Sequence, residues 1–165
     1  MDAIFSRTSV RSYEEKPVEA SKIEKILRAA MAAPSAMNQQ PWEFYVVTDK
    51  SVLQELSKAS PYTGMVEGAP VAIVVCGRKE NLPVPDLVQV DLSLSTENIL
   101  LEIEEQGLGG VMLGIAPFAD RMERVSRALN LSENLDVFTV VPFGYPAKKN
   151  PQQDRYDESR VHYIK

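Results

Sequence analysis

The chain has 165 residues, 44% hydrophobic and 25% charged, which is typical of one globular domain with its own core. Eighteen Lys and Arg against 23 Asp and Glu give a net charge of −5, which argues against a broad nucleic-acid surface. The longest apolar run is far shorter than the ~20 residues of a membrane helix, and the first residues are too polar for a signal peptide. The composition therefore predicts a single cytoplasmic domain over residues 1–165.

The N-terminal segment RTSVRSY is the first candidate binding element. In an extended conformation Arg7, Ser9 and Arg11 alternate along the backbone and point the same way. Two guanidiniums and a hydroxyl converging on one point suit a phosphate monoester, because they offer charge-assisted donors around a neutral one. A solvated basic surface strand explains the same pattern, so periodicity alone leaves both interpretations open.

An amphipathic helix is predicted next, over SKIEKILRAAMAA. Its apolar residues recur at the i, i+3, i+4, i+7 spacing of a buried helix face. Ser21 and Glu24 have the spacing of a capping box at its N-terminus, and Pro34 ends it. The following run WEFYVVT is typical of a strand, and DKSVLQELSKAS of a short helix that Pro61 ends.

The loop APSAMNQQP between that helix and that strand is richer in amides than a connection requires. Ser35, Asn38, Gln39 and Gln40 offer both donors and acceptors, which suits the edge of a heterocycle with mixed carbonyl and N–H groups. The flanking prolines would stiffen the loop before a ligand binds. Ordinary loop polarity is the alternative, and the amides alone do not exclude it.

The remaining elements alternate between strands and helices. PVAIVVCG is predicted to be an inner strand, and 89–106 a long helix with Leu94, Ile99, Leu101 and Ile103 on its apolar side and Gly107 after its end. GGVMLGI is predicted to be a further buried strand, FADRMERVSRALN a helix and VFTVVPFGY the last strong strand. Pro142 suggests that this last strand ends at an edge or a bulge, and the tail ESRVHYIK has the weak alternation of a terminal edge strand. Such an order indicates an α/β or α+β sandwich.

Several kinds of chemistry are poorly supported. A single His162 and a single Cys76 cannot build a His/Cys zinc site, and a hydrolase would have to use that terminal histidine as its base. In GLGGVMLG, Met112 occupies the third glycine position of a dinucleotide-binding loop, and the segment runs from a helix into a strand, the reverse of the required order. Gly114 could still let a flat ligand approach the backbone.

Taken together, these segments resemble the nitroreductase-like FMN-dependent oxidoreductase family. RTSVRSY resembles its R-x-S-x-[RK]-x-[FY] segment, APSAMNQQPWEFYVV is similar to its P-S-x-x-N-x-Q-P-W-x-F signature, and GLGGVMLG to its G-L-G-x-x-x-x-G turn. FGYPAKK and DRYDESRVHYIK resemble the end of the last core strand and the tail after it. The resemblance spans nearly the whole chain.

This resemblance implies an α+β fold, with a central, mostly antiparallel sheet flanked by helices in a three-layer α/β/α sandwich, and an intertwined homodimer. It implies FMN at the dimer interface, NADH or NADPH as electron donor, and a small-molecule acceptor such as a nitroaromatic or quinone. The phosphate would be held by Arg7, Ser9 and Arg11, with the backbone of Thr8 contributing and Arg155 as a further partner. The ribityl chain and ring would be lined by Pro34, Ser35, Ala36, Met37 and Asn38 of the other subunit, with Gln40 close by. Met112, Leu113 and Gly114 would lie along the ring.

The same resemblance implies no catalytic side chain, because a flavin itself carries the hydride while the protein positions it and excludes water. Two alternatives share the fold: a non-redox flavin-binding module, and an enzyme that uses flavin and oxygen on a dedicated substrate. The segment between Tyr62 and Asp91 is short compared with many members. It is expected to cover the flavin or contact the partner, and to set the range of substrates.

Overall fold

A computed structural model describes residues 3–148, 151–152 and 154–165 of the chain. Its centre is an antiparallel sheet of five strands: β1 (Trp42–Val47), β2 (Val71–Arg78), β3 (Gly109–Gly110), β4 (Leu113–Gly114) and β5 (Leu135–Gly144). The spatial order is β1-β2-β5-β3, and β4 also pairs with β5. The longest strands, β2 and β5, therefore lie in the interior of the sheet, where their continuous apolar sequences are buried.

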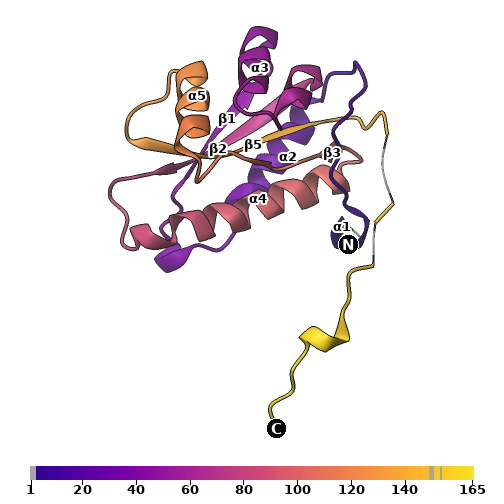
Figure 1. The fold of residues 1–165 in the computed structure, drawn as a ribbon, viewed down its shortest axis with the longest axis vertical. Helices are drawn as coiled ribbons and strands as arrows, with labels where there is room; N and C mark the ends of the chain where they lie inside the picture. The colour runs from indigo at the N-terminus through magenta and orange to yellow at the C-terminus, as the bar shows by residue number, and fades with distance from the viewer. Residues whose placement is uncertain (1–2, 149–150, 153) are drawn as a thin grey trace.

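Helices cover both faces of this sheet (Figure 1). One face carries α2 (Ala20–Met31) and α4 (Val88–Glu105), and the other carries α3 (Lys50–Ser57) and α5 (Ala119–Leu129). The short elements are α1 (Ala3–Ser6), η1 (Ala36–Asn38), η2 (Gly64–Gly68), η3 (Pro85–Leu87) and η4 (Glu158–Arg160). The predicted α+β fold, with a central antiparallel sheet and flanking helices, is confirmed.

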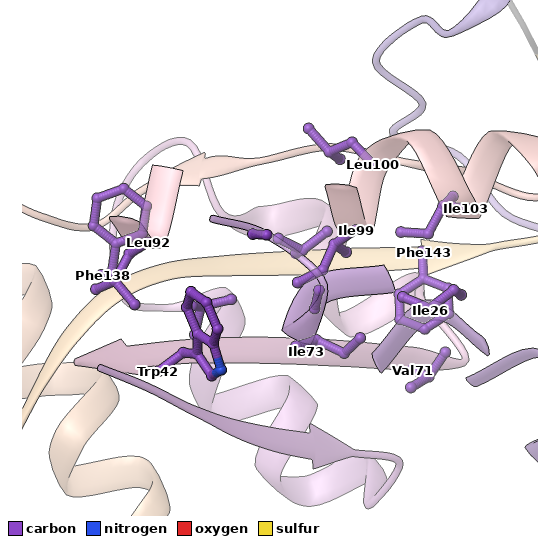
Figure 2. Packing of buried hydrophobic residues seen from close by; sticks show 14 of the residues in the cluster. Ile26, Trp42, Val71, Ile73, Leu92, Ile99, Leu100, Ile103, Phe138 and Phe143 are labelled. Atoms are coloured by element: carbon purple, nitrogen blue, oxygen red, sulfur yellow. The ribbon is translucent and has the colours of Figure 1, made fainter. Parts of the chain in front are cut away.

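Alternation along β2 divides the core into two clusters. Ile73 and Val75 point to the α2/α4 side, while Ala72, Val74 and Cys76 point to the α3/α5 side. Trp42, the only tryptophan, lies in the first cluster near Phe138 and Leu92 (Figure 2). The indole thus fixes the point where the amide-rich loop enters the sheet, as a large buried aromatic does.

Three local expectations differ from the structure. Helix α2 begins at Ala20 after Glu19, and no side chain caps it, so the capping box of Ser21 and Glu24 does not form. Pro142 lies inside β5, a central strand, rather than at an edge. The tail is no edge strand: residues 154–165 form only η4 and lie exposed, away from the sheet (Figure 1).

The predicted strand GGVMLGI is broken into β3 and β4, and Pro142 explains the break. The carbonyl of Pro142 accepts the N–H of Val111, so the proline nitrogen faces the same neighbour. Because that nitrogen carries no hydrogen, the ladder with β5 is interrupted at this level. Of the two residues between the short strands, Val111 stays buried and bonded to β5, whereas Met112 is exposed.

Helix α4 buries only part of its apolar surface. Ile99 and Ile103 lie in the core as expected, but Leu94 is 43% exposed and Leu101 is only half-buried. Leu87 and Val90 add to the exposed apolar face near Leu94. This apolar face is therefore left open to solvent within the single chain.

Candidate functional site

The N-terminal segment is held against β3. Ser9 forms a parallel bridge with Gly110, and the N–H of Val10 donates to the carbonyl of Gly110 at 3.0 Å. A Cβ on Gly109 would lie 2.5 Å from Cγ2 of buried Val10, so only glycine permits this approach. Gly109 of the GLG sequence therefore allows the close packing of residues 7–13, the arginine segment, against β3.

Tyr13 fixes the other end of the same segment. Its hydroxyl lies 2.8 Å from the carbonyl of Val10 and 3.1 Å from that of Pro142. Burial raises the pKa of Tyr13 far above its ordinary value, so the phenol keeps the proton that it donates. This side chain links the arginine segment to β5.

The five predicted phosphate-binding residues line one open pocket of about 320 Å³. They are Arg7, Thr8, Ser9, Arg11 and Arg155, and Pro151 and Gln152 complete the lining. Although Arg155 and Arg11 stand near opposite ends of the sequence, the fold brings the two guanidiniums to the same opening. The convergence is compatible with the phosphate-site interpretation, which stays a prediction.

The polar groups of this pocket are only partly used. The hydroxyl oxygen of Thr8 is buried and has no hydrogen-bond partner among the described residues. Arg7 approaches one carboxylate, Glu97, at 4.0 Å. A buried hydroxyl without a partner is costly, and an anion with several oxygens would supply the missing bond.

The amide-rich loop adopts an unusual backbone conformation that contacts fix. Met37, Asn38 and Gln40 have φ of 47°, 54° and 45°, a left-handed backbone region that residues other than glycine seldom adopt. The hydroxyl of Ser35 accepts the N–H of Gln40 at 3.0 Å, and the amide of Gln40 donates to Oδ1 of Asn38 at 3.0 Å. Met37 stays 77% exposed, so the loop presents its tip to the outside.

A buried pair, Asp91 and Gln39, secures this loop. Asp91 is 2% exposed and accepts the N–H of Ala36 at 2.9 Å and the amide of Gln39 at 2.7 Å. Gln39 is 8% exposed and exchanges two 3.0 Å bonds with the backbone of Val84. Its amide thus serves the structure rather than a heterocycle. No local pattern signals this role, because Asp91 lies 52 residues away in the chain.

The third group of predicted residues lies at β4. Leu113 is buried and its carbonyl accepts the Thr139 hydroxyl at 2.6 Å, whereas Met112 and Gly114 are exposed. A Cβ on Gly114 would meet nothing within 4 Å, so its surroundings are open. Arg121 donates to the carbonyl of Gly114 at 2.7 Å, a neighbour that sequence reasoning missed.

Within one chain, the loop and the phosphate pocket lie at different levels of α4. The loop is bonded to Asp91, and Ser6, just before the arginine segment, donates to Glu104 at 2.8 Å. At 1.5 Å per residue, Glu104 lies about 20 Å from Asp91 along the helix axis, and Glu97, which Arg7 approaches, lies about 9 Å from it. The pocket lining contains no residue of the loop.

Two kinds of site receive no support within the described part of the chain. No group of three or more His, Cys, Asp or Glu could hold a metal ion among residues 3–148, 151–152 and 154–165. Across the same residues, no helix is long and apolar enough to cross a membrane.

Comparison with known proteins places these features in one family. The family model "Nitroreductase family" matches residues 4–61 and 60–145. A protein of Methanothermobacter thermautotrophicus named "Putative NADH dehydrogenase/NAD(P)H nitroreductase" is 39% identical over 165 residues, covering 100% of this chain and 86% of its own length.

Solved structures agree with this relationship. An FMN-dependent nitroreductase of Clostridium difficile superposes with a TM-score of 0.92 at 28% identity, covering 99% of this chain and 98% of that one. An NADPH:FMN oxidoreductase of Vibrio harveyi, complexed with NAD+, gives a TM-score of 0.86 at 25% identity, with 99% and 76% covered. The chain therefore belongs to the nitroreductase family and is an oxidoreductase of that family.

Proposed function

We propose that this single-domain chain is an FMN-dependent NAD(P)H oxidoreductase that passes electrons to a nitroaromatic or a quinone. With a quinone, NAD(P)H and one proton yield NAD(P)+ and the hydroquinone, so the electrons balance. The observation that carries the proposal is the phosphate pocket, which Arg7, Ser9, Arg11 and Arg155 line together with Thr8, whose buried hydroxyl has no hydrogen-bond partner in the described part of the chain.

The residues present fit FMN. The pocket offers guanidiniums and hydroxyls, the donor set of a phosphate monoester. Thr8 has an unused buried hydroxyl, and Gly109 lets the arginine segment approach β3 closely enough to form the pocket. When bound, the flavin supplies the hydride chemistry. The chain's task is then to hold the phosphate, orient the ring and exclude water.

We infer that two chains share each site. The loop carrying Pro34, Ser35, Ala36, Met37, Asn38 and Gln40 contributes no residue to the phosphate pocket of its own chain. The exposed apolar residues Leu87 of η3 and Val90 and Leu94 of α4, together with the exposed tail, supply surface for a partner. A homodimer in which the partner's loop meets Met112, Leu113 and Gly114 completes the site.

The electron donor is inferred from the relatives. The Vibrio harveyi protein is named for NADPH and was solved with NAD+, and the Clostridium difficile protein is described as FMN-dependent. A flavin exposed near Met112 and Gly114, the open side of β4, would be reachable by a nicotinamide and then by an acceptor.

The direct test is the absorption spectrum of the purified protein, followed by anaerobic titration with NADH and NADPH separately. We expect a yellow protein that is bleached by a nicotinamide and reoxidised by a quinone or nitroaromatic. Colourless protein that ignores added FMN would refute the proposal. Bound FMN without turnover would instead favour a non-redox flavin-binding module. Reoxidation by oxygen only in the presence of one dedicated substrate would favour an enzyme that uses flavin and oxygen on that substrate.

The variant Arg11→Ala tests whether this pocket binds the FMN phosphate. Arg11→Ala should weaken FMN binding by about 1.5–3 kcal/mol, because a charge-assisted bond is lost. Arg124→Ala is the matched control, since this exposed arginine lies on α5 outside the pocket. The dissociation constant for FMN, measured by fluorescence, should change only for Arg11→Ala. Equal constants for the two variants would place the phosphate elsewhere.

A further inference from the structure

An arginine flanked by exposed aromatic rings lies beside β4. The guanidinium carbon of Arg121 is 4.0 Å from the centroid of the Phe118 ring and 5.7 Å from that of Tyr62. Phe118 is 48% exposed and Tyr62 is 70% exposed. Phe118 and Arg121 lie one turn apart at the start of α5, and the fold brings Tyr62, from the segment before η2, beside them.

The charge of Arg121 is not matched by a carboxylate. Among the described residues, no Asp or Glu oxygen lies within 4.0 Å of it, whereas Arg28, Arg127 and Arg160 each have such a partner. Within the part of the chain that the structure describes, the side chain of Arg121 makes one hydrogen bond, from Nη1 to the carbonyl of Gly114. In a chain of net charge −5, this leaves a local positive centre whose planar donors can still receive an anion.

The position of the cluster relates it to the flavin. Gly110 adjoins Ser9 of the phosphate pocket and Gly114 adjoins Arg121. Four residues of extended chain span at most about 13 Å. If the phosphate pocket beside Gly110 holds the flavin phosphate and Gly114 lies along the ring, Arg121 would lie beside the ring as well.

We propose that Tyr62, Phe118 and Arg121 form the acceptor subsite, and that it favours planar aromatic acceptors carrying an anionic group such as a carboxylate. The proposal rests on the proposed function, because the ring's place is part of it. Exposed aromatic rings offer a stacking surface for a planar molecule, and the guanidinium, already oriented by Gly114 and Phe118, offers bidentate recognition of a carboxylate.

The test compares two acceptors that differ in charge, 4-nitrobenzoate and 4-nitrobenzamide. In Arg121→Gln, kcat/KM should fall about tenfold for the carboxylate, the size of one charge-assisted contact, and less than twofold for the amide. Arg121→Lys should recover part of the loss. Arg124→Gln is the control: it also removes one positive charge from α5, and kcat/KM should stay unchanged for both acceptors.

A binding measurement separates this inference from the proposed function. Benzoate, which cannot be reduced, should bind the oxidised holoprotein in a calorimetric titration, with an affinity that falls in Arg121→Gln and with added salt. Equal losses for both acceptors, or unchanged benzoate binding, would show that Arg121 only supports β4. If the wild-type protein holds no FMN or oxidises no nicotinamide, the proposed function itself fails.

Discussion

Asp91 shows how a single residue shapes a site that it does not line. The carboxylate is buried at the start of α4, where the helix dipole favours a negative charge, and it accepts two hydrogen bonds from the amide-rich loop. A loop with three residues at positive φ carries a conformational penalty, and such strain persists only where neighbouring contacts fix it. We therefore regard Asp91 and Gln39 as positioning residues for the exposed tip at Met37.

Asp91→Asn tests this role. An asparagine would present its NH2 group to one of the two donors, so we expect a loss of about 1–3 kcal/mol in the free energy of unfolding. Urea denaturation followed by circular dichroism measures the loss. Asp86→Asn, an exposed residue of η3, is the control and should stay near the wild-type value. Equal stability of the two variants would show that the loop needs no buried acceptor.

Cys76 gives a prediction about pH. Burial, together with the charges of Glu43 and Asp136, raises the pKa of its thiol from 9.0 to about 12. Between these values the unfolded chain has lost the proton while the folded chain keeps it, so the free energy of unfolding falls as pH rises. In Cys76→Ala this contribution is absent, and the variant should lose stability less steeply.

Paired denaturation curves of the wild type and Cys76→Ala at pH 8, 9.5 and 10.5 provide the measurement. At pH 8 the variant is expected to be the less stable of the two, since it leaves a cavity in the sheet. The difference should shrink as pH rises. A difference that stays constant would mean that the buried thiol ionises as easily as in the unfolded chain.

At the scale of elements, the junction of the arginine segment with β3 determines whether the phosphate pocket forms. Three contacts make it: the bond from Val10 to Gly110, the close approach of Val10 to Gly109, and the hydroxyl of Tyr13 between two carbonyls. The pocket is therefore a property of this junction rather than of the arginine segment alone.

Gly109→Ala tests the junction. The added methyl group would lie 2.5 Å from Val10, and such overpacking costs about 1–3 kcal/mol. We expect a lower melting temperature and weaker FMN binding together. Gly64→Ala is the matched control, because a Cβ there meets nothing within 4 Å. If the Gly109→Ala variant binds FMN normally, the segment can shift without disturbing the pocket.

The elements also show what sequence can predict. The periodicity of α2 and the apolar run of β2 are local signals, and the observed bounds of both elements lie close to the predicted ones. Gly107, with φ of 71°, follows α4 as predicted, because a left-handed residue after a helix favours glycine. The break between β3 and β4 escapes prediction, since it depends on Pro142 in the facing strand.

The same limit applies to the site. The alternation of Arg7, Ser9 and Arg11 allows either a phosphate site or a surface strand, and the resemblance favours the former and adds Arg155, which lines the same pocket. The roles of Gln39 and Arg121 could not be predicted, because their partners Asp91 and Tyr62 are distant in sequence. Which residues line the flavin stays a prediction for the variants above to test.

At the scale of the whole molecule, the exposed apolar side of α4 leads to a prediction about assembly. Leu94→Glu should dissociate the proposed dimer, because it places a charge in an apolar contact. FMN retention should fall with it, since each site needs both chains. Leu94→Ala, which removes size without adding charge, should dissociate far less.

Sedimentation velocity combined with the flavin absorbance of each species measures both effects. A wild-type protein that sediments as a monomer with FMN bound would contradict the shared site. A Leu94→Glu protein that remains dimeric would place the contact on another surface of the chain.

The break opposite Pro142 has a further consequence, for aggregation. On that side the sheet ends in two strands of two residues each, and the arginine segment covers one of them. A short, interrupted and covered edge is a poor template for another chain. The opposite edge is β1, six uninterrupted residues with one described strand neighbour. Edge-to-edge association with another chain is therefore expected at β1 rather than at the β3/β4 edge. Glu43, an exposed charge on β1, opposes such pairing.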